Sequence, residues 1–232
     1  KIVGISFSLE KSKACYVAIR TPMGEPSLDE SFVLDKLRPI FANKDILKVN
    51  QNIKFDLLVL LVNGMTTEGV AGDSMIADYL LHSGERSHGL DELVKRYLNH
   101  EMISITELIG VKGKNKVQKL MSEVNSEVVA LYACEDSDAA FQLASFLEDE
   151  ISKTVVDGSK DRLLELYKKI EMPLVSVLAR MQFRGISIDA AFLKILGVEM
   201  ALELERVEKE IHILAGKPFQ ISSLPQLRAV LY

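Results

Sequence analysis

The chain has 232 residues, of which 48% are hydrophobic, and a formal net charge of −5. This length suffices for one large domain, or for one domain with part of another, in an ordinary globular protein. Residues 1–152 hold 16 Lys+Arg against 23 Asp+Glu, whereas residues 153–232 hold 12 against 10. The acidic first part argues against a broad basic face for phosphate, although a small site where clustered acids hold cations remains compatible with it.

Two further features limit the cellular setting. No apolar stretch reaches the roughly 18 residues that span a bilayer, and the amino terminus lacks the organisation of a signal peptide. Cys15 and Cys134 are far apart and follow no metal or redox spacing. We therefore expect a reduced, cytoplasmic protein that does not contact membranes.

The first sixty residues alternate between strand and helix patterns. Residues 2–8 and 14–20 are rich in β-forming side chains and predict a hairpin across the polar link between them. An amphipathic helix is predicted over 34–41, a strand over 47–49, and a helix over 53–62 that ends at an Asn-Gly pair. This order favours an α/β domain with a mixed sheet.

Helices dominate the rest of the chain. Asp73 is predicted to cap a helix, and residues 91–98 predict another. A loop rich in Gly and Lys covers 110–116, and a long helix is expected over 122–153. Residues 154–160 are typical of a domain boundary, and the sequence beyond them is almost entirely helical.

The stretch QNIKFD places a carboxylate, Asp56, at the start of the 53–62 helix. Capping accounts for it locally, because Asn52 is a favoured N-cap residue and an acid in the first turn complements the helix dipole. A functional role for Asp56 is the alternative that these six residues leave open.

A second carboxylate, Asp136, falls on the apolar stripe of the long helix. Tyr132 lies one turn before it, so the phenol and the carboxylate are expected side by side. Burying a carboxylate without a partner costs several kcal/mol, so a salt bridge to another helix, a hydrogen bond or a metal ion should accompany it. The stripe is made of Val128, Tyr132, Ala139, Leu143 and Leu147.

Other common chemistries lack support. The four histidines have no metal-ligand spacing, and no Gly-x-Ser-x-Gly motif occurs. The loop at 110–116 is not a P-loop, because it lacks the Gly-Lys-Ser/Thr ending. Lys112, Lys114, Lys116 and Lys119 are candidate phosphate contacts, and a solvated loop is the alternative.

Taken together, the two acid motifs resemble the second and third motifs of the 3′–5′ exonucleases, and the surrounding sequence resembles the bacterial DNA polymerase I family. The resemblance extends over nearly the whole chain. It rests on the stretches KVNQNIKFD, GDSMIADYLL, SHGLDELVKRYL, ITELIGVKGKN, YACEDSDA, IEMPLVSVLARMQFRGISID and FQISSLPQL.

The resemblance implies an RNase H-like exonuclease domain in residues 1–153 and the opening helices of a polymerase thumb in residues 161–232. In the family, four carboxylates hold two Mg²⁺ or Mn²⁺ ions about the 3′-terminal phosphodiester of single-stranded or frayed DNA. By position, Asp56 and Asp136 would be metal ligands and Tyr132 would orient the attacking water. Gln51, Asn52 and Phe55 would line the single-stranded 3′ end.

One departure bears on activity. The family's first motif, Asp-x-Glu, supplies the other two carboxylates from a strand upstream of the one matched by residues 2–8, and no such motif is present here. We therefore expect this chain alone to be inactive, although the parent protein would be a monomeric DNA polymerase acting on primer-template DNA in replication and repair. The alternatives are a degenerate domain that serves as a structural or DNA-binding scaffold, and an RNase H-like nuclease unrelated to polymerases.

Overall fold

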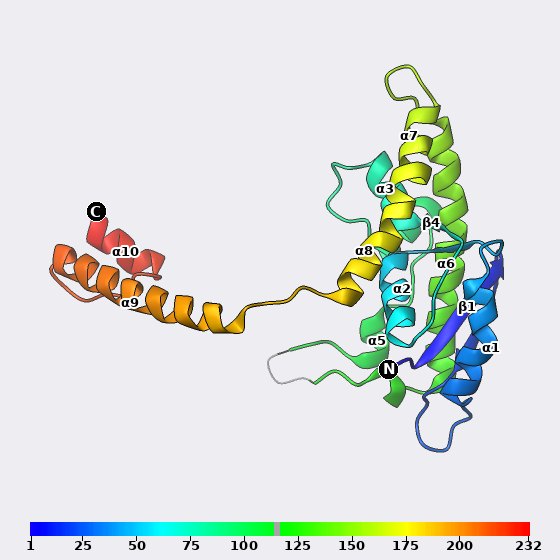
Figure 1. The fold of residues 1–232 in the computed structure, drawn as a ribbon, viewed down its shortest axis with the longest axis horizontal. Helices are drawn as coiled ribbons and strands as arrows, with labels where there is room; N and C mark the ends of the chain where they lie inside the picture. Colours follow the sequence, from blue (N-terminus) through cyan, green and yellow to red (C-terminus); the bar gives the residue numbers. More distant parts are fainter. Residues whose placement is uncertain (114–116) are drawn as a thin grey trace. The chain divides into compact units, whose positions relative to one another are not determined.

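The computed structural model describes residues 1–113 and 117–232, which form two compact units, Lys1–Gly185 and Ile186–Tyr232 (Figure 1). The first unit opens with a hairpin of strands β1 (Gly4–Glu10) and β2 (Lys13–Ala18), in which Phe7 pairs with Cys15. Helix α1 (Glu30–Ala42) follows, and its first turn is capped by Asp29, whose carboxylate accepts a hydrogen bond from the Phe32 N–H at 2.9 Å. This cap explains why α1 begins four residues before the predicted start.

The next four elements build the centre of the unit. Strand β3 (Lys48–Asn50) leads into α2 (Ile53–Val62), and β4 (Val70–Asp73) leads into α3 (Ser74–Leu81). Strands β3 and β4 pair in parallel, so both strands deliver their helices at the same edge of the sheet. The bounds of α2 agree with the prediction, whereas β4 was missed, because four residues with two glycines at or beside them carry little strand signal.

Short helical segments connect the centre to the long helix. They are α4 (Leu90–Leu93), the π-helical turn η1 (Val94–Leu98), α5 (Ile105–Ile109) and the 3₁₀ turn η2 (Met121–Glu123). Lys114 and Lys116, two of the predicted phosphate contacts, lie outside the described residues.

Helix α6 (Ser126–Lys153) is the helix on which most of the first unit packs. It packs against all four strands and against α3. It begins after the predicted Ser122, because the Asn125 side chain caps it and the preceding residues form η2. The predicted stripe was wrong at Val128, which is exposed, and Val129 is buried in its place. Its buried face is formed by Val129, Ala139, Ala140, Leu143, Ala144, Leu147 and Ile151.

Residues after the predicted boundary continue as α7 (Asp161–Leu166), the π-helical turn η3 (Tyr167–Glu171) and α8 (Met172–Arg184). Helix α7 packs on α6 and α8 packs on α2, so these segments share the hydrophobic core of the first unit (Figure 1). The second unit contains α9 (Ala190–Ala215) and α10 (Leu224–Leu231). Within the described residues, no helix combines the length and the apolar character that crossing a bilayer requires.

Candidate active site

The corner between β3 and α2 carries Asp56 and its neighbours. Asp56 lies in the first turn of α2, and its carboxylate accepts a hydrogen bond from the Asn50 side-chain amide at 2.9 Å. Burial raises the pKa of Asp56 to about 6, and the negative charge of Asp73 adds to the rise. The hydrogen bond from Asn50 offsets only part of the free-energy cost of burying the charged carboxylate. A bound cation would therefore stabilise the charged form of Asp56.

The prediction of Asn52 as the N-cap residue of α2 is correct in position, but the Asn52 side chain is not the group that caps the helix. Asn52 occupies the N-cap position of α2 in a left-handed conformation, with φ 51° and ψ 46°, and its side chain makes no capping hydrogen bond. The carboxylate of Asp73 takes that role, since it accepts from the Asn52 and Ile53 N–H groups at 3.1 and 2.9 Å. Asp73 also caps α3, as predicted from the sequence.

Gln51 and Phe55 flank this turn. The Gln51 amide donates to the His88 carbonyl at 2.7 Å, and its oxygen accepts from the Ser74 hydroxyl. No other described residue takes the second amide hydrogen or the second lone pair of Gln51, so both can serve a ligand. Phe55 is 61% exposed although it is a large apolar side chain. An exposed aromatic ring beside a carboxylate is suited to stacking against a base.

Helix α6 carries the second acid. Asp136 is half-buried, and desolvation raises its pKa to about 6, with further contributions from the charges of Asp91 and Glu135. Tyr132 lies one turn before Asp136 on α6, and burial, with the negative charge of Asp136 adding to it, raises the pKa of that phenol well above its usual value. Tyr132 is therefore a hydrogen-bond donor at neutral pH, which is the state needed to orient a water molecule.

The acids that flank Asp136 have structural roles. Glu135 accepts from His100 at 2.8 Å and from the Ile103 N–H at 2.7 Å. Asp138 accepts from the Ser12 N–H at 2.7 Å and so ties α6 to the hairpin. Within residues 1–113 and 117–232, by contrast, Asp136 forms no ion pair, which disfavours the salt-bridge alternative.

Packing of α6 on β3 brings the helix that bears Asp136 to the strand that enters the Asp56 corner. The described residues contain no group of three or more His, Cys, Asp or Glu side chains arranged to hold a metal ion. Asp56 and Asp136 carry carboxylate oxygens, the ligand type that Mg²⁺ prefers, but two such side chains fall short of a complete ligand set. Lys112 is exposed, as a phosphate contact requires.

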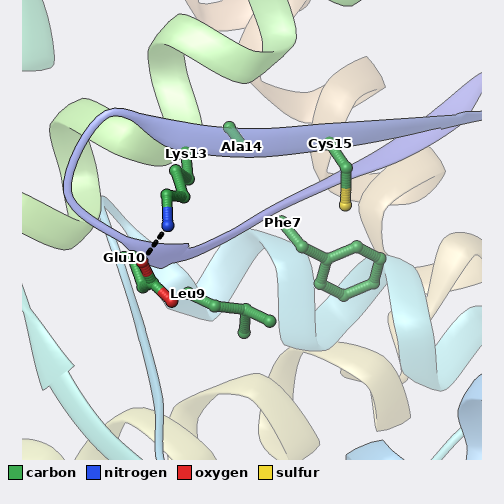
Figure 2. A pocket seen from close by; sticks show the side chains of 6 residues that line it. All are labelled: Phe7, Leu9, Glu10, Lys13, Ala14 and Cys15. Carbon is green, nitrogen blue, oxygen red and sulfur yellow. Dashed lines mark hydrogen bonds and ion pairs between the residues drawn. The ribbon is translucent and has the colours of Figure 1, made fainter.

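A pocket elsewhere on the first unit lies on the β1–β2 hairpin, where Lys13 and Glu10 form an ion pair (Figure 2). None of the residues predicted for the active site lines this pocket. Its lining consists of Phe7, Leu9, Glu10, Lys13, Ala14 and Cys15.

Sequence reasoning missed three contributors to the site. Asn50 donates to Asp56, the Asp73 carboxylate reaches across to α2, and Tyr167 hydrogen-bonds to the backbone of Asp73. Asn50 stands six residues before Asp56 with no motif to mark it. The other two contacts span 20 and 94 residues along the chain, so no local pattern could have revealed them.

Comparisons with known proteins agree with the predicted fold. A family model described as 3′–5′ exonuclease matches residues 1–152. DNA polymerase I of Pseudomonas aeruginosa is 34% identical over 100% of this chain and 25% of its own length, and that of Synechocystis is 32% identical over 99% and 22%. The chain thus spans about a quarter of the length of these relatives.

The solved structure of the POL domain of Pol1 from M. smegmatis, in complex with DNA primer-template and dNTP, matches with a TM-score of 0.69. The match covers 94% of this chain and 34% of the chain in that structure. Because the two sequences are only 24% identical, the match bears on the fold alone. The predicted α/β, RNase H-like fold and the resemblance to DNA polymerase I are both confirmed. The chain belongs to the 3′–5′ exonuclease family.

Proposed function

We propose that residues 1–153 form most of a metal-dependent proofreading exonuclease and that residues 161–232 begin the polymerase thumb of a DNA polymerase I. The observation that carries this proposal is the pair of partly buried carboxylates, Asp56 on α2 and Asp136 on α6, whose elements are brought together by the packing of α6 on β3. Burial raises the pKa of both carboxylates to about 6. Neither forms an ion pair with a described side chain. A divalent cation is the partner that would stabilise both.

Two Mg²⁺ or Mn²⁺ ions, when bound, would lower the pKa of an attacking water and neutralise the leaving 3′-oxygen of a phosphodiester. Asp56 would hold an ion from the α2 side and Asp136 from the α6 side. The Tyr132 hydroxyl, which stays protonated at neutral pH and lies one turn from Asp136 on α6, would orient the water that attacks the phosphorus.

Two carboxylates are too few for two ions, so the remaining ligands must come from elsewhere. We propose an upstream Asp-x-Glu strand as their source. Among the described residues, β1 pairs only with β2 and β3 only with β4, yet α6 packs against all four strands. A further strand between β1 and β3 would join the two sheets beneath α6 and bring its acids beside Asp56 and Asp136.

The substrate would be the single-stranded 3′ end of DNA, frayed from a primer-template. Phe55 would stack on a terminal base, while the free lone pair and amide hydrogen of Gln51 and the Asn52 side chain would bind sugar or base edges. Lys112, with Lys114 and Lys116, would contact phosphates further along the strand. The parent protein would act as a monomer in the cytoplasm.

Hydrolysis of a 5′-labelled single-stranded oligonucleotide with Mg²⁺ tests this function. A protein extended upstream by about 30 residues, enough for one strand and its turn, should give a descending ladder. Asp136→Asn should abolish the ladder, whereas Asp149→Asn, an exposed acid on the same helix, should leave it intact.

This chain without the extension should not cut, and robust hydrolysis by it would contradict the proposed ligand set. If the extended wild-type protein folds but does not cut, the domain is a scaffold that has kept only its shape.

A further inference from the structure

The turn that presents Gln51 and Asn52 is intrinsically unfavourable. Asn52 adopts a left-handed conformation, which asparagine tolerates better than most residues but which still costs free energy relative to a right-handed one. It is followed at once by the first turn of α2, whose leading N–H groups have no partner within the helix. Something outside the turn must therefore stabilise it.

The Asp73 carboxylate provides that stabilisation. It accepts hydrogen bonds from the backbone of Asn52 and Ile53 at 3.1 and 2.9 Å, and also from Met75 and Ile76 at 2.9 and 3.4 Å. One carboxylate, 1% exposed, thus caps two helices whose starts are about 20 residues apart. Such charge-assisted bonds are stronger than those of a neutral cap.

Asp73 is itself fixed by Tyr167, a fully buried residue from η3. The Tyr167 hydroxyl accepts from the Asp73 N–H at 2.8 Å and lies 3.4 Å from the Asp73 carbonyl oxygen. The fit is close, because a Cβ added at Gly72 would lie 3.3 Å from that hydroxyl. Tyr167 therefore determines where the backbone of Asp73 can lie.

The residue after Asp73 holds the other half of the turn. The Ser74 hydroxyl, fully buried, donates to the Gln51 side-chain oxygen. The end of β4 and the start of α3 consequently fix both the Gln51 side chain and the Asn52 backbone. Asp56 lies three residues into α2, where the helix and the Asn50 side-chain amide hold it separately from this turn.

Resting on the proposed function, we propose that Asp73 and Tyr167 are positioning residues for binding of the DNA 3′ end: Asp73 fixes the Gln51–Asn52 turn, and Tyr167 fixes Asp73. Tyr167 lies beyond residues 1–152, the part matched by the exonuclease family. The exonuclease site therefore depends on a segment that follows the exonuclease region in sequence.

Amide hydrogen exchange of this chain tests the positioning without reference to catalysis. Tyr167→Phe removes the hydroxyl with little change in shape, and Asp73→Asn removes one of the two acceptor oxygens. Both should speed exchange at Asn52 and Ile53 by about 3- to 10-fold, in line with loss of one hydrogen bond. Exchange over Ala139–Leu147 of α6 should stay within twofold. The matched control is Asp29→Ala, which removes the side-chain cap of α1 and leaves the Gln51–Asn52 turn untouched.

Steady-state cleavage by the upstream-extended protein supplies the second measurement. Tyr167→Phe should raise KM for a single-stranded oligonucleotide about 3- to 10-fold, with kcat changed less than KM, because the bonds it loses support binding rather than the metal ligands. A general loss of stability would not produce that split. If wild type fails to cut while the exchange result holds, the proposed function fails and the positioning stands.

Unchanged exchange at Asn52 and Ile53 in both variants would overturn the proposal. So would an equal effect of Asp29→Ala on those amides, since this would mean that loss of any helix cap loosens the turn.

Discussion

The two regions that carry the predicted metal ligands are built in different ways. Asp136 and Tyr132 stand on one continuous 28-residue helix, α6, whose position is set by apolar packing against four strands. Asp56 stands at the end of a left-handed turn that depends on polar contacts from β4 and η3. Substitutions in the apolar core should therefore disturb the helix side of the site, which is α6 with Asp136. Loss of single hydrogen bonds should disturb the corner side, which is the β3–α2 turn with Asp56.

The largest effect is expected on the helix side. Leu143→Ala removes a fully buried side chain from the core face of α6 and should lower the free energy of unfolding by about 2–5 kcal/mol. Leu131→Ala, at a position 66% exposed on the same helix, is the control and should cost little. Urea denaturation followed by circular dichroism measures both. Equal losses would mean that packing does not hold α6 in place.

On the corner side, Phe55→Ala should separate binding from stability. Because the ring is exposed, its loss should leave the melting temperature nearly unchanged. Loss of one base-stacking contact should weaken binding of a single-stranded oligonucleotide by about 1–3 kcal/mol. Fluorescence anisotropy in the upstream-extended protein measures the affinity. The control, Phe32→Ala, removes a similarly exposed ring on α1, and a comparable loss there would point to nonspecific stacking.

Both acids should make stability depend on pH in the metal-free chain. The folded pKa of Asp56 is about 6, above its ordinary value of 3.8, so the folded state binds more protons between these values. Its contribution to stability is then fully present below pH 4 and is lost as pH rises through 6.

Asp56→Asn replaces the ionisable carboxyl by a neutral amide, so the variant does not lose this stability as the pH rises. The variant should therefore gain stability relative to wild type at pH 7.5, and the gain should shrink by about 1 kcal/mol by pH 5. Thermal melts at the two pH values measure this, and Asp136→Asn should behave alike. A gain that is constant with pH would show that neither carboxyl has a raised pKa.

The smallest effect is expected from Lys112, in the loop rich in Gly and Lys over residues 110–116. Lys112→Ala should weaken oligonucleotide binding slightly and reduce the slope of log affinity against log salt by about 1, as loss of one phosphate contact requires. Salt titration of the anisotropy signal measures the slope. Lys36→Ala on α1 serves as the control, and an unchanged slope for Lys112→Ala would remove that residue from the DNA interface.

The same division separates the features that were predictable from the sequence from those that were not. The helix side was predictable, because the apolar spacing of α6 and the i, i+4 placement of Tyr132 and Asp136 are local signals. The bounds of α2 were predictable for the same reason. The corner was not, because β4 is too short to show a strand pattern and the Asp73 contacts to Asn52 and Ile53 join distant parts of the chain. Asp73 was foreseen only as the cap of its own helix.

The central claim is that Asp56 and Asp136, despite their different supports, hold metal ions in one site. Anomalous diffraction from crystals of the upstream-extended protein soaked in Mn²⁺ tests it directly. Anomalous peaks are expected within coordination distance, about 2.0–2.2 Å, of both carboxylates, and a peak should be lost in Asp136→Asn. Absence of any peak at these two side chains, in crystals of a protein that cleaves DNA with Mn²⁺, would contradict the claim.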